Sequence, residues 1–438
     1  MMNAVRRIFA VVVGAWFCAG AYGAAIINDT EIERHLTELV EPLADAAGIA
    51  PGRLKINVVH SDDFNAFVSG GEEVYIYTGL LTQIKTPDAL QAVVAHELGH
   101  TLGGHMAQMS ARMNAELKRT AIVQALGVGL MVAGGNPSLG MGVLAGTAGM
   151  ATQSMLAFSR DEERMADNLG LDLMMRAGQN LNGFVDVFEQ MRDITGAAEE
   201  KINPNRVNHP LTAERLKNVR DYIAARPSDY KSDARRDANR RAQYELVRAK
   251  LVGYLYPGER VRTLYPATDK SDAALYARAI ANMRAGNLAA AKTGTQTLIS
   301  RHGQNPYFYE LLGDIEYQYG HYDDSVAAYD KSLTLAGGAP QIQTALALVL
   351  SERDKPGDRD RAIELCRRAL LAEPAALTYW VLARAWGDGD GRADWAMAEY
   401  YNMTGDQKKT HQYATRARKR LAKSAPEYIK STELLRKD

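Results

Sequence analysis

The spacing of hydrophobic residues along the chain predicts a mainly helical protein with one small sheet. A helix is predicted to begin at a capping box of Thr30 and Glu33, and its apolar face consists of Ile32, Leu36, Leu39 and Leu43. Residues 54–59 alternate between apolar and polar side chains, which indicates a strand. Residues 67–77 contain two apolar runs around a Gly-Gly pair and are typical of a hairpin.

A second helix is predicted from Pro87 onward, and its first turn is well specified. Thr86 is a suitable N-cap, Pro87 fits the first helical position, and Asp88 complements the positive end of the helix dipole. Its apolar residues recur at helical spacing: Leu90, Val93, Val94 and Leu98. One face is therefore expected to pack into a core while the opposite face opens to a cleft.

This second helix carries an HExxH motif, His96-Glu97-Leu98-Gly99-His100. Residues four apart lie on one helical face, so His96 and His100 can each direct a ring nitrogen at one zinc ion. Glu97 is offset by one residue, which places its carboxylate where the general base of a peptidase acts on water. The motif predicts a zinc metallopeptidase, and the alternative is a surface helix with two solvated histidines.

Catalytic zinc takes three protein ligands, and His105 is the nearest candidate for the third. It follows His100 by five residues, which is roughly 140° round a helix, so it cannot share the ligand face while the helix continues. A metzincin would carry its third His at position 106, which is Met in this chain.

Acidic residues further along the chain are better candidates. Residues 159–178 predict a helix that opens at Ser159 and ends at Gly178. Glu163 and Asp167 are one turn apart on this helix, the arrangement of a ligand and of a carboxylate that supports a ligating side chain. Glu162 is an equally acidic neighbour, and the spacing alone does not separate it from Glu163.

The motifs together resemble the gluzincin family that contains the heat-shock protease HtpX and the CAAX prenyl endopeptidases. HExxH is followed by Ser-Arg-x-x-Glu-x-x-Ala-Asp at residues 159–167 and by His-Pro-Leu-Thr-Ala-Glu-Arg at residues 209–215. The resemblance implies an α+β peptidase domain with one zinc per chain, in which Glu163 is the third ligand and Asp167 supports the ligands.

Two further site residues come from the third motif. Arg215 is a candidate for stabilising the developing oxyanion or for buttressing the cleft. His209 matches a histidine that, in close relatives, occupies the fourth zinc position and keeps the enzyme latent. The alternative for His209 is a structural residue that precedes the helix beginning at Thr212.

The carboxy-terminal part shows a period of about 34 residues, which predicts an α-solenoid of tetratricopeptide repeats over residues 266–438. The clearest repeat has Leu312-Gly313, Gly320, Ser325 and Tyr329 at the expected positions. Cys366 occupies a core position of a later repeat and is expected to be buried. The basic cluster at residues 416–420 is interpreted as a solvated face.

The amino terminus has the pattern of a cleaved signal peptide, residues 1–23, which leaves residues 24–265 for the metallopeptidase domain. Arg6 and Arg7 precede an uncharged apolar stretch, and Ala21-Tyr22-Gly23 supplies small residues for cleavage. Cleavage would remove Cys18 and leave a single cysteine, so no disulfide forms within the mature chain. The formal net charge of +0 gives no indication of a nucleic-acid partner.

Residues 121–158 carry no charge and are rich in Gly, Ala, Met and Leu. We interpret them as a helical hairpin or lid over the active site that makes peripheral contact with the membrane. Neither half forms a convincing transmembrane span, and true insertion is the alternative.

The layout of signal peptide, peptidase and repeats resembles the periplasmic branch of the family, the β-barrel assembly-enhancing proteases. The resemblance implies a periplasmic zinc endopeptidase that degrades misassembled outer-membrane β-barrel precursors and assists their assembly. Its expected partners are unfolded or stalled precursors and the β-barrel assembly machinery. The alternative is mainly a chaperone or scaffold for outer-membrane protein assembly with latent protease activity.

Overall fold

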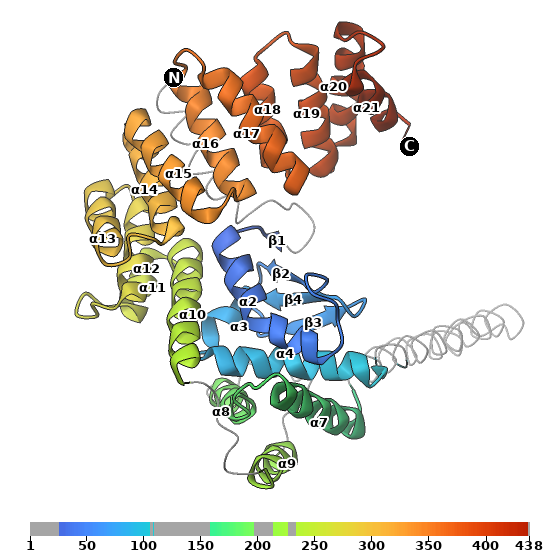
Figure 1. Ribbon diagram of the computed structural model, residues 1–438, viewed down its shortest axis with the longest axis vertical. Coiled ribbons are helices and arrows are strands. Elements are labelled where there is room, and N and C mark those ends of the chain that lie inside the picture. Colours follow the sequence, from blue (N-terminus) through green and yellow to red (C-terminus); the bar gives the residue numbers. More distant parts are fainter. Residues whose placement is uncertain (1–25, 106–107, 109–157, 197–212, 227–233, 437–438) are drawn as a thin grey trace, which may run out of the picture. The chain divides into compact units, whose positions relative to one another are not determined.

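The computed structural model describes residues 26–105, 108, 158–196, 213–226 and 234–436. This part of the chain is mainly helical with a small sheet, as predicted (Figure 1). It forms two compact units, which we call the motif unit, His35–Val58 and Asp62–Tyr244, and the repeat unit, Met1–Arg34, Val59–Ser61 and Glu245–Asp438. The units divide within two helices, α2 (Thr30–Ala46) and α10 (Ala234–Leu255). The domain boundary near residue 265 remains a proposal from the sequence.

The sheet has four strands in the order β1-β2-β4-β3, namely β1 (Ile26–Ile27), β2 (Lys55–Val59), β4 (Glu73–Tyr77) and β3 (Ala66–Ser69). Strands β3 and β4 are antiparallel, with Ala66 opposite Ile76 and Ser69 opposite Glu73. Gly70 and Gly71 form the connection with φ of 61° and 81°, a backbone conformation that glycine adopts without steric cost. The predicted strand and hairpin are both confirmed.

The cap of the first helix differs from the prediction by one residue. Thr30 is the first residue of α2, and Asp29 is the cap, since its Oδ1 accepts a hydrogen bond from the Ile32 backbone N–H at 3.0 Å. Glu33 Oε1 accepts from the Asp29 N–H at 2.9 Å. The predicted apolar face of the helix is buried, as expected.

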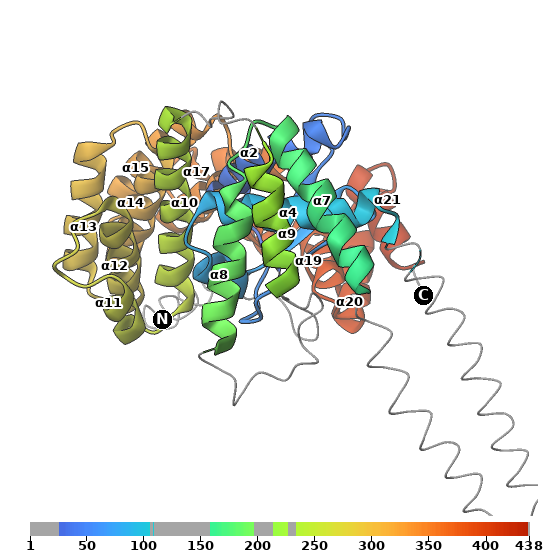
Figure 2. The ribbon, with the colours of Figure 1, turned by 90° about the horizontal axis from the view of Figure 1, so that it is seen from below.

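In the described part of the motif unit, the remaining helices are α3 (Thr78–Gln83), α4 (Pro87–Leu102), α7 (Arg160–Arg176), α8 (Asn182–Gly196) and α9 (Ala213–Ala224). Helix α4 contacts strand β3 on one side and helices α7 and α8 on the other (Figure 1). Helix α9 contacts both α7 and α8 (Figure 2). Helix α4 is therefore the central element of the described part of this unit.

The repeat unit consists mainly of antiparallel helix pairs. Its helices after α10 are α11 (Gly258–Leu264), α12 (Asp272–Arg284), α13 (Leu288–Arg301), α14 (Pro306–Tyr319), α15 (Tyr322–Ala336), α16 (Pro340–Arg353), α17 (Asp358–Ala372), α18 (Ala376–Trp386), α19 (Gly391–Met403), α20 (Gln407–Arg420) and α21 (Pro426–Leu434). Successive helices contact each other from α11 to α21, which gives tetratricopeptide-like repeats.

The clearest predicted repeat is confirmed in its packing. A Cβ on Gly313 would lie 2.8 Å from the Tyr329 ring, so glycine is needed where α14 crosses α15. Ser325 Oγ donates a hydrogen bond to the Gly313 carbonyl at 2.8 Å, and Gly320 ends α14 with φ of 80°. Cys366 is fully buried in the core, also as predicted, and burial raises the pKa of its thiol to about 12.

A buried ionic cluster, which we call the Lys250 cluster, lies within the repeat unit. Lys250 Nζ is 2.8 Å from Asp29 Oδ2, 3.1 Å from Glu31 Oε2 and 3.5 Å from Glu310 Oε2. Tyr276 Oη donates a hydrogen bond to Glu31 Oε2 at 2.7 Å. Asp29 and Glu31, which precede the peptidase motifs in the sequence, are thereby joined to α10, α12 and α14. The repeat period alone did not predict this connection.

The Lys250 cluster makes the stability of the repeat unit depend on pH. Burial raises the pKa of Glu310 from 4.5 to about 8, against the opposing charge of Lys250. A carboxyl group whose pKa is raised by folding stabilises the fold fully below its unfolded pKa, and this contribution is lost as the pH rises through the folded pKa. We therefore expect a smaller free energy of unfolding at pH 8.5 than at pH 6, and a weaker pH dependence in Glu310→Gln.

Tryptophan fluorescence during urea unfolding measures this effect in the repeat unit. The tryptophans beyond residue 23 are Trp380, Trp386 and Trp395, and all belong to that unit. Glu364→Gln is the matched control because Glu364 lies on the exposed face of α17. An equal pH dependence in both variants would contradict the assignment to Glu310.

Candidate metal centre

Helix α4 begins where the sequence predicts. Thr86 Oγ1 accepts a hydrogen bond from the Ala89 N–H at 3.2 Å, and Pro87 is the first helical residue. The helix continues through the HExxH motif to Leu102 without interruption. His96, Glu97 and His100 are buried, with 7%, 7% and 1% of their surface exposed, so the motif is not on a solvated surface helix.

The start of helix α7 distinguishes Glu162 from Glu163. Ser159 Oγ accepts from the Glu162 N–H at 3.2 Å, and Glu162 Oε2 accepts from the Ser159 N–H at 2.8 Å. These reciprocal bonds form a capping box and direct the Glu162 carboxylate at the helix end. The next residue, Glu163, points to the histidines of α4 instead.

Helices α4 and α7 approach so closely that they need small residues at their crossing. A Cβ on Gly99 would lie 2.5 Å from the Ala166 carbonyl oxygen, and one on Gly170 would lie 3.0 Å from the Ala95 carbonyl carbon. Glycine therefore allows the two backbones to touch at two points. This short separation brings the carboxylates of α7 within reach of the imidazoles of α4.

Three donor atoms converge between these helices. His96 Nε2 and His100 Nε2 are 3.1 Å apart, and the Glu163 oxygens lie 3.5 Å from the first and 3.6 Å from the second. Ligands about 2.0–2.1 Å from a tetrahedral zinc ion are about 3.3–3.4 Å from one another. The two His and one Glu thus match both the donor set and the spacing of a catalytic zinc site.

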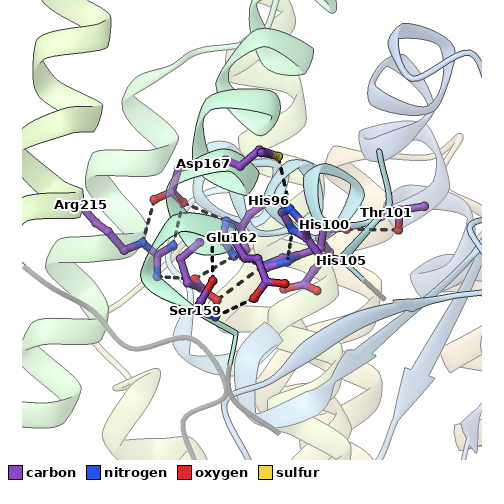
Figure 3. Close-up of polar contacts among 11 residues, drawn as sticks. His96, His100, Thr101, His105, Ser159, Glu162, Asp167 and Arg215 are labelled. Atoms are coloured by element: carbon purple, nitrogen blue, oxygen red, sulfur yellow. Dashed lines mark hydrogen bonds and ion pairs between the residues drawn. The ribbon is translucent and has the colours of Figure 1, made fainter. Parts of the chain in front are cut away.

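Asp167 and Arg215 surround these donors on the side of α9 (Figure 3). His96 Nδ1 is 2.9 Å from Asp167 Oδ1, and Arg215 binds both Asp167 oxygens at 2.7 Å. Arg215 Nη1 also lies 2.6 Å from Glu163 Oε2. Of the two roles predicted for Arg215, this geometry supports buttressing, since the guanidinium is held by the two carboxylates.

The charges in this group alter its pKa values. Burial lowers the pKa of His96, but its hydrogen bonds to the carboxylates of Asp167 and Glu163 outweigh this effect and raise the pKa to about 9. Burial raises the pKa of Asp167, but its bonds to Arg215 and His96 outweigh it and leave the pKa below its usual value. Asp167 therefore stays ionised and holds the His96 ring in one orientation.

A largely apolar pocket adjoins the donor atoms. Glu97, His96 and Arg215 form part of its lining, and the apolar part consists of Phe64, Leu80, Val93, Phe184, Val187, Phe188 and Met191. The α8 residues were missed in the sequence. Their apolar spacing, at positions 184, 187 and 188, indicates a helix face that packs inward, but not that this face borders the HExxH motif.

Several predictions concern residues outside the described part of the chain. His209 and the uncharged stretch 121–157 are among them, as is the signal peptide, residues 1–23. Within the described ranges, no helix has the length and apolar composition needed to cross a membrane.

Comparisons with known proteins agree with this site. Residues 31–223 match the model of peptidase family M48, and the protein is a metalloendopeptidase. The family resemblance drawn from the motifs is thereby confirmed.

Two curated relatives extend the likeness beyond that domain. The chain is 24% identical over 382 residues to the beta-barrel assembly-enhancing protease of Yersinia pestis, which covers 83% of this chain and 74% of the relative. It is 25% identical over 305 residues to the protein of that name from Escherichia coli, and the aligned part covers 67% of this chain and 60% of the relative. Among solved structures, a thermophilic TPR protein from Thermus thermophilus aligns with 44% of this chain and 91% of its own, at 17% identity and a TM-score of 0.26.

Proposed function

We propose that this protein is a zinc-dependent endopeptidase that acts in the periplasm on outer-membrane β-barrel precursors. The observation that carries the proposal is the buried triangle of His96, His100 and Glu163, whose spacing suits zinc. The name that the two relatives share, beta-barrel assembly-enhancing protease, supports the substrate class. The predicted signal peptide supports export.

The chain's own residues then have distinct roles. When bound, zinc polarises the scissile carbonyl and makes water more acidic. Glu97, which borders the pocket, takes a proton from water and delivers it to the leaving amine. Asp167 orients His96, and Arg215 holds Asp167 and Glu163 in place. The apolar pocket accepts a side chain next to the scissile bond and excludes water there.

The repeats supply a binding surface in this proposal. Stacked helix pairs suit the recognition of an extended precursor segment or of the assembly machinery. A second candidate function is a chaperone or scaffold role in assembly, which the repeats and the relatives' name both favour. In that case His209 would keep the peptidase latent, and His209→Ala would raise basal proteolysis at unchanged zinc content.

Zinc content separates the proposed ligand from its neighbour. We expect Glu163→Gln to lower zinc stoichiometry by at least tenfold under mild chelation, because it removes a ligand. Glu162→Gln is the matched control, since Gln also serves in a capping box, and it should retain both zinc and cleavage of an unfolded β-barrel precursor. Zinc loss in Glu162→Gln but not in Glu163→Gln would overturn the ligand assignment.

A further inference from the structure

The helical backbone is interrupted directly after the HExxH motif, and this interruption changes the direction of the next side chains. Helix α4 ends at Leu102, and Gly104 has φ of 68°, a left-handed conformation that interrupts the helix. A Cβ on Gly103 would lie 2.6 Å from His105 Nε2, so the His105 ring lies against Gly103. As a result His105 is buried, with 1% of its surface exposed, although helical spacing would have turned it away from His100.

His105 contacts the ligand helix and the third-ligand helix at once (Figure 3). Its Nδ1 is 3.0 Å from Nδ1 of His100, the ring nitrogen that lies away from the donor triangle. Its Nε2 is 3.3 Å from Met165 Sδ, and Met165 lies on α7 between Glu163 and Asp167. The ring of Phe158 stacks on His100 with centroids 3.9 Å apart, which confines the imidazole further.

These contacts determine where the ring protons lie. A neutral His100 that offers Nε2 to a metal carries its proton on Nδ1, and His105 Nδ1, at 3.0 Å, is placed to accept this N–H. His105 then carries its own proton on Nε2, which donates to the sulfur of Met165. With this assignment each ring nitrogen of His100 and His105 has one role, and Nε2 of the neutral His100 is available for a ligand.

We infer that His105 is a positioning residue for the ligand His100, with Met165 as the group that fixes the His105 tautomer. This inference rests on the proposed zinc-binding function. His105 does for His100 what Asp167 does for His96: each accepts a hydrogen bond from the ligand's distal nitrogen. The two ligating imidazoles are thus held by different chemical groups, a neutral ring and a carboxylate.

The test compares two variants of nearly equal size in the full-length mature protein. His105→Asn places an amide oxygen close to the position of Nδ1, whereas His105→Leu offers no acceptor. Zinc dissociation constants are measured by competition with a chelator, and cobalt-substituted protein gives a visible spectrum that reports on ligand geometry. We expect His105→Leu to bind zinc 10- to 100-fold more weakly and His105→Asn to recover most of that loss.

Each outcome has a distinct meaning. Equal zinc affinity and an equal cobalt spectrum in wild type and His105→Leu would overturn the inference. It would also be overturned if His105→Asn bound zinc no more tightly than His105→Leu. If wild type itself binds no zinc, the proposed function fails instead. Should His105→Leu not fold, Met165→Leu replaces it, because Met165 is half exposed and the change preserves its volume. Met165→Leu is expected to weaken zinc binding severalfold, and an unchanged dissociation constant would reject the tautomer assignment.

Discussion

A Glu97→Gln variant is expected to bind zinc as wild type does and to cleave an unfolded β-barrel precursor at least a hundredfold more slowly. Gln fills the same space but cannot take a proton from water, and general-base catalysis contributes typically 10²–10⁴-fold to rate. Glu97 borders the pocket but is not one of the three proposed zinc ligands, His96, His100 and Glu163, so its substitution should leave zinc binding unchanged. Metal analysis and single-turnover cleavage on the same preparation measure both quantities.

Glu162→Gln serves as the control for Glu97→Gln. Both residues are buried, Glu162 with 9% and Glu97 with 7% of its surface exposed. The carboxylate of Glu162, however, is used in the capping box of α7. The control should therefore cleave at the wild-type rate. Cleavage retained by Glu97→Gln at full zinc occupancy would exclude Glu97 as the base, and zinc loss in that variant would make it a ligand.

The second large effect is expected from Lys250→Met, which should destabilise the repeat unit by about 3–5 kcal/mol at neutral pH. Lys250 is the shared cation of Asp29 and Glu31, at 2.8 and 3.1 Å, and its side chain is only 4% exposed. Met fills the volume but leaves these carboxylates buried without the charge that compensates them. Urea unfolding followed by tryptophan fluorescence measures the loss.

Two further variants make the Lys250 prediction specific. Lys331→Met changes an exposed lysine on α15 and should alter stability by less than about 0.5 kcal/mol. Adding Asp29→Asn to Lys250→Met removes one of the buried charges and keeps a residue that can cap α2, so it should restore part of the stability. A loss below about 1 kcal/mol in Lys250→Met would contradict the role of Lys250 as the group that compensates the buried carboxylates.

Local patterns predicted the elements well because short-range physics decides them. The cap at Thr86 and the hairpin follow from neighbours within a few residues, and the glycine position in the repeat of α14 and α15 follows from the repeat period. The capping box at Thr30 was wrong by one residue because Asp29 is an equally good cap. Nothing in the local pattern ranks the two, and Asp29 also pairs with Lys250.

By itself, the sequence determined the HExxH helix, the two acidic candidates on the next motif and the helical repeats. These depend on the period of the helix and on short motifs, which the chain carries in its order of residues. Only the tertiary structure decided that Glu163 faces the histidines of α4 and that Arg215 lies on two carboxylates. Both depend on two segments meeting at a definite distance, and for α4 and α7 that distance is set by packing at Gly99 and Gly170, which no periodicity encodes.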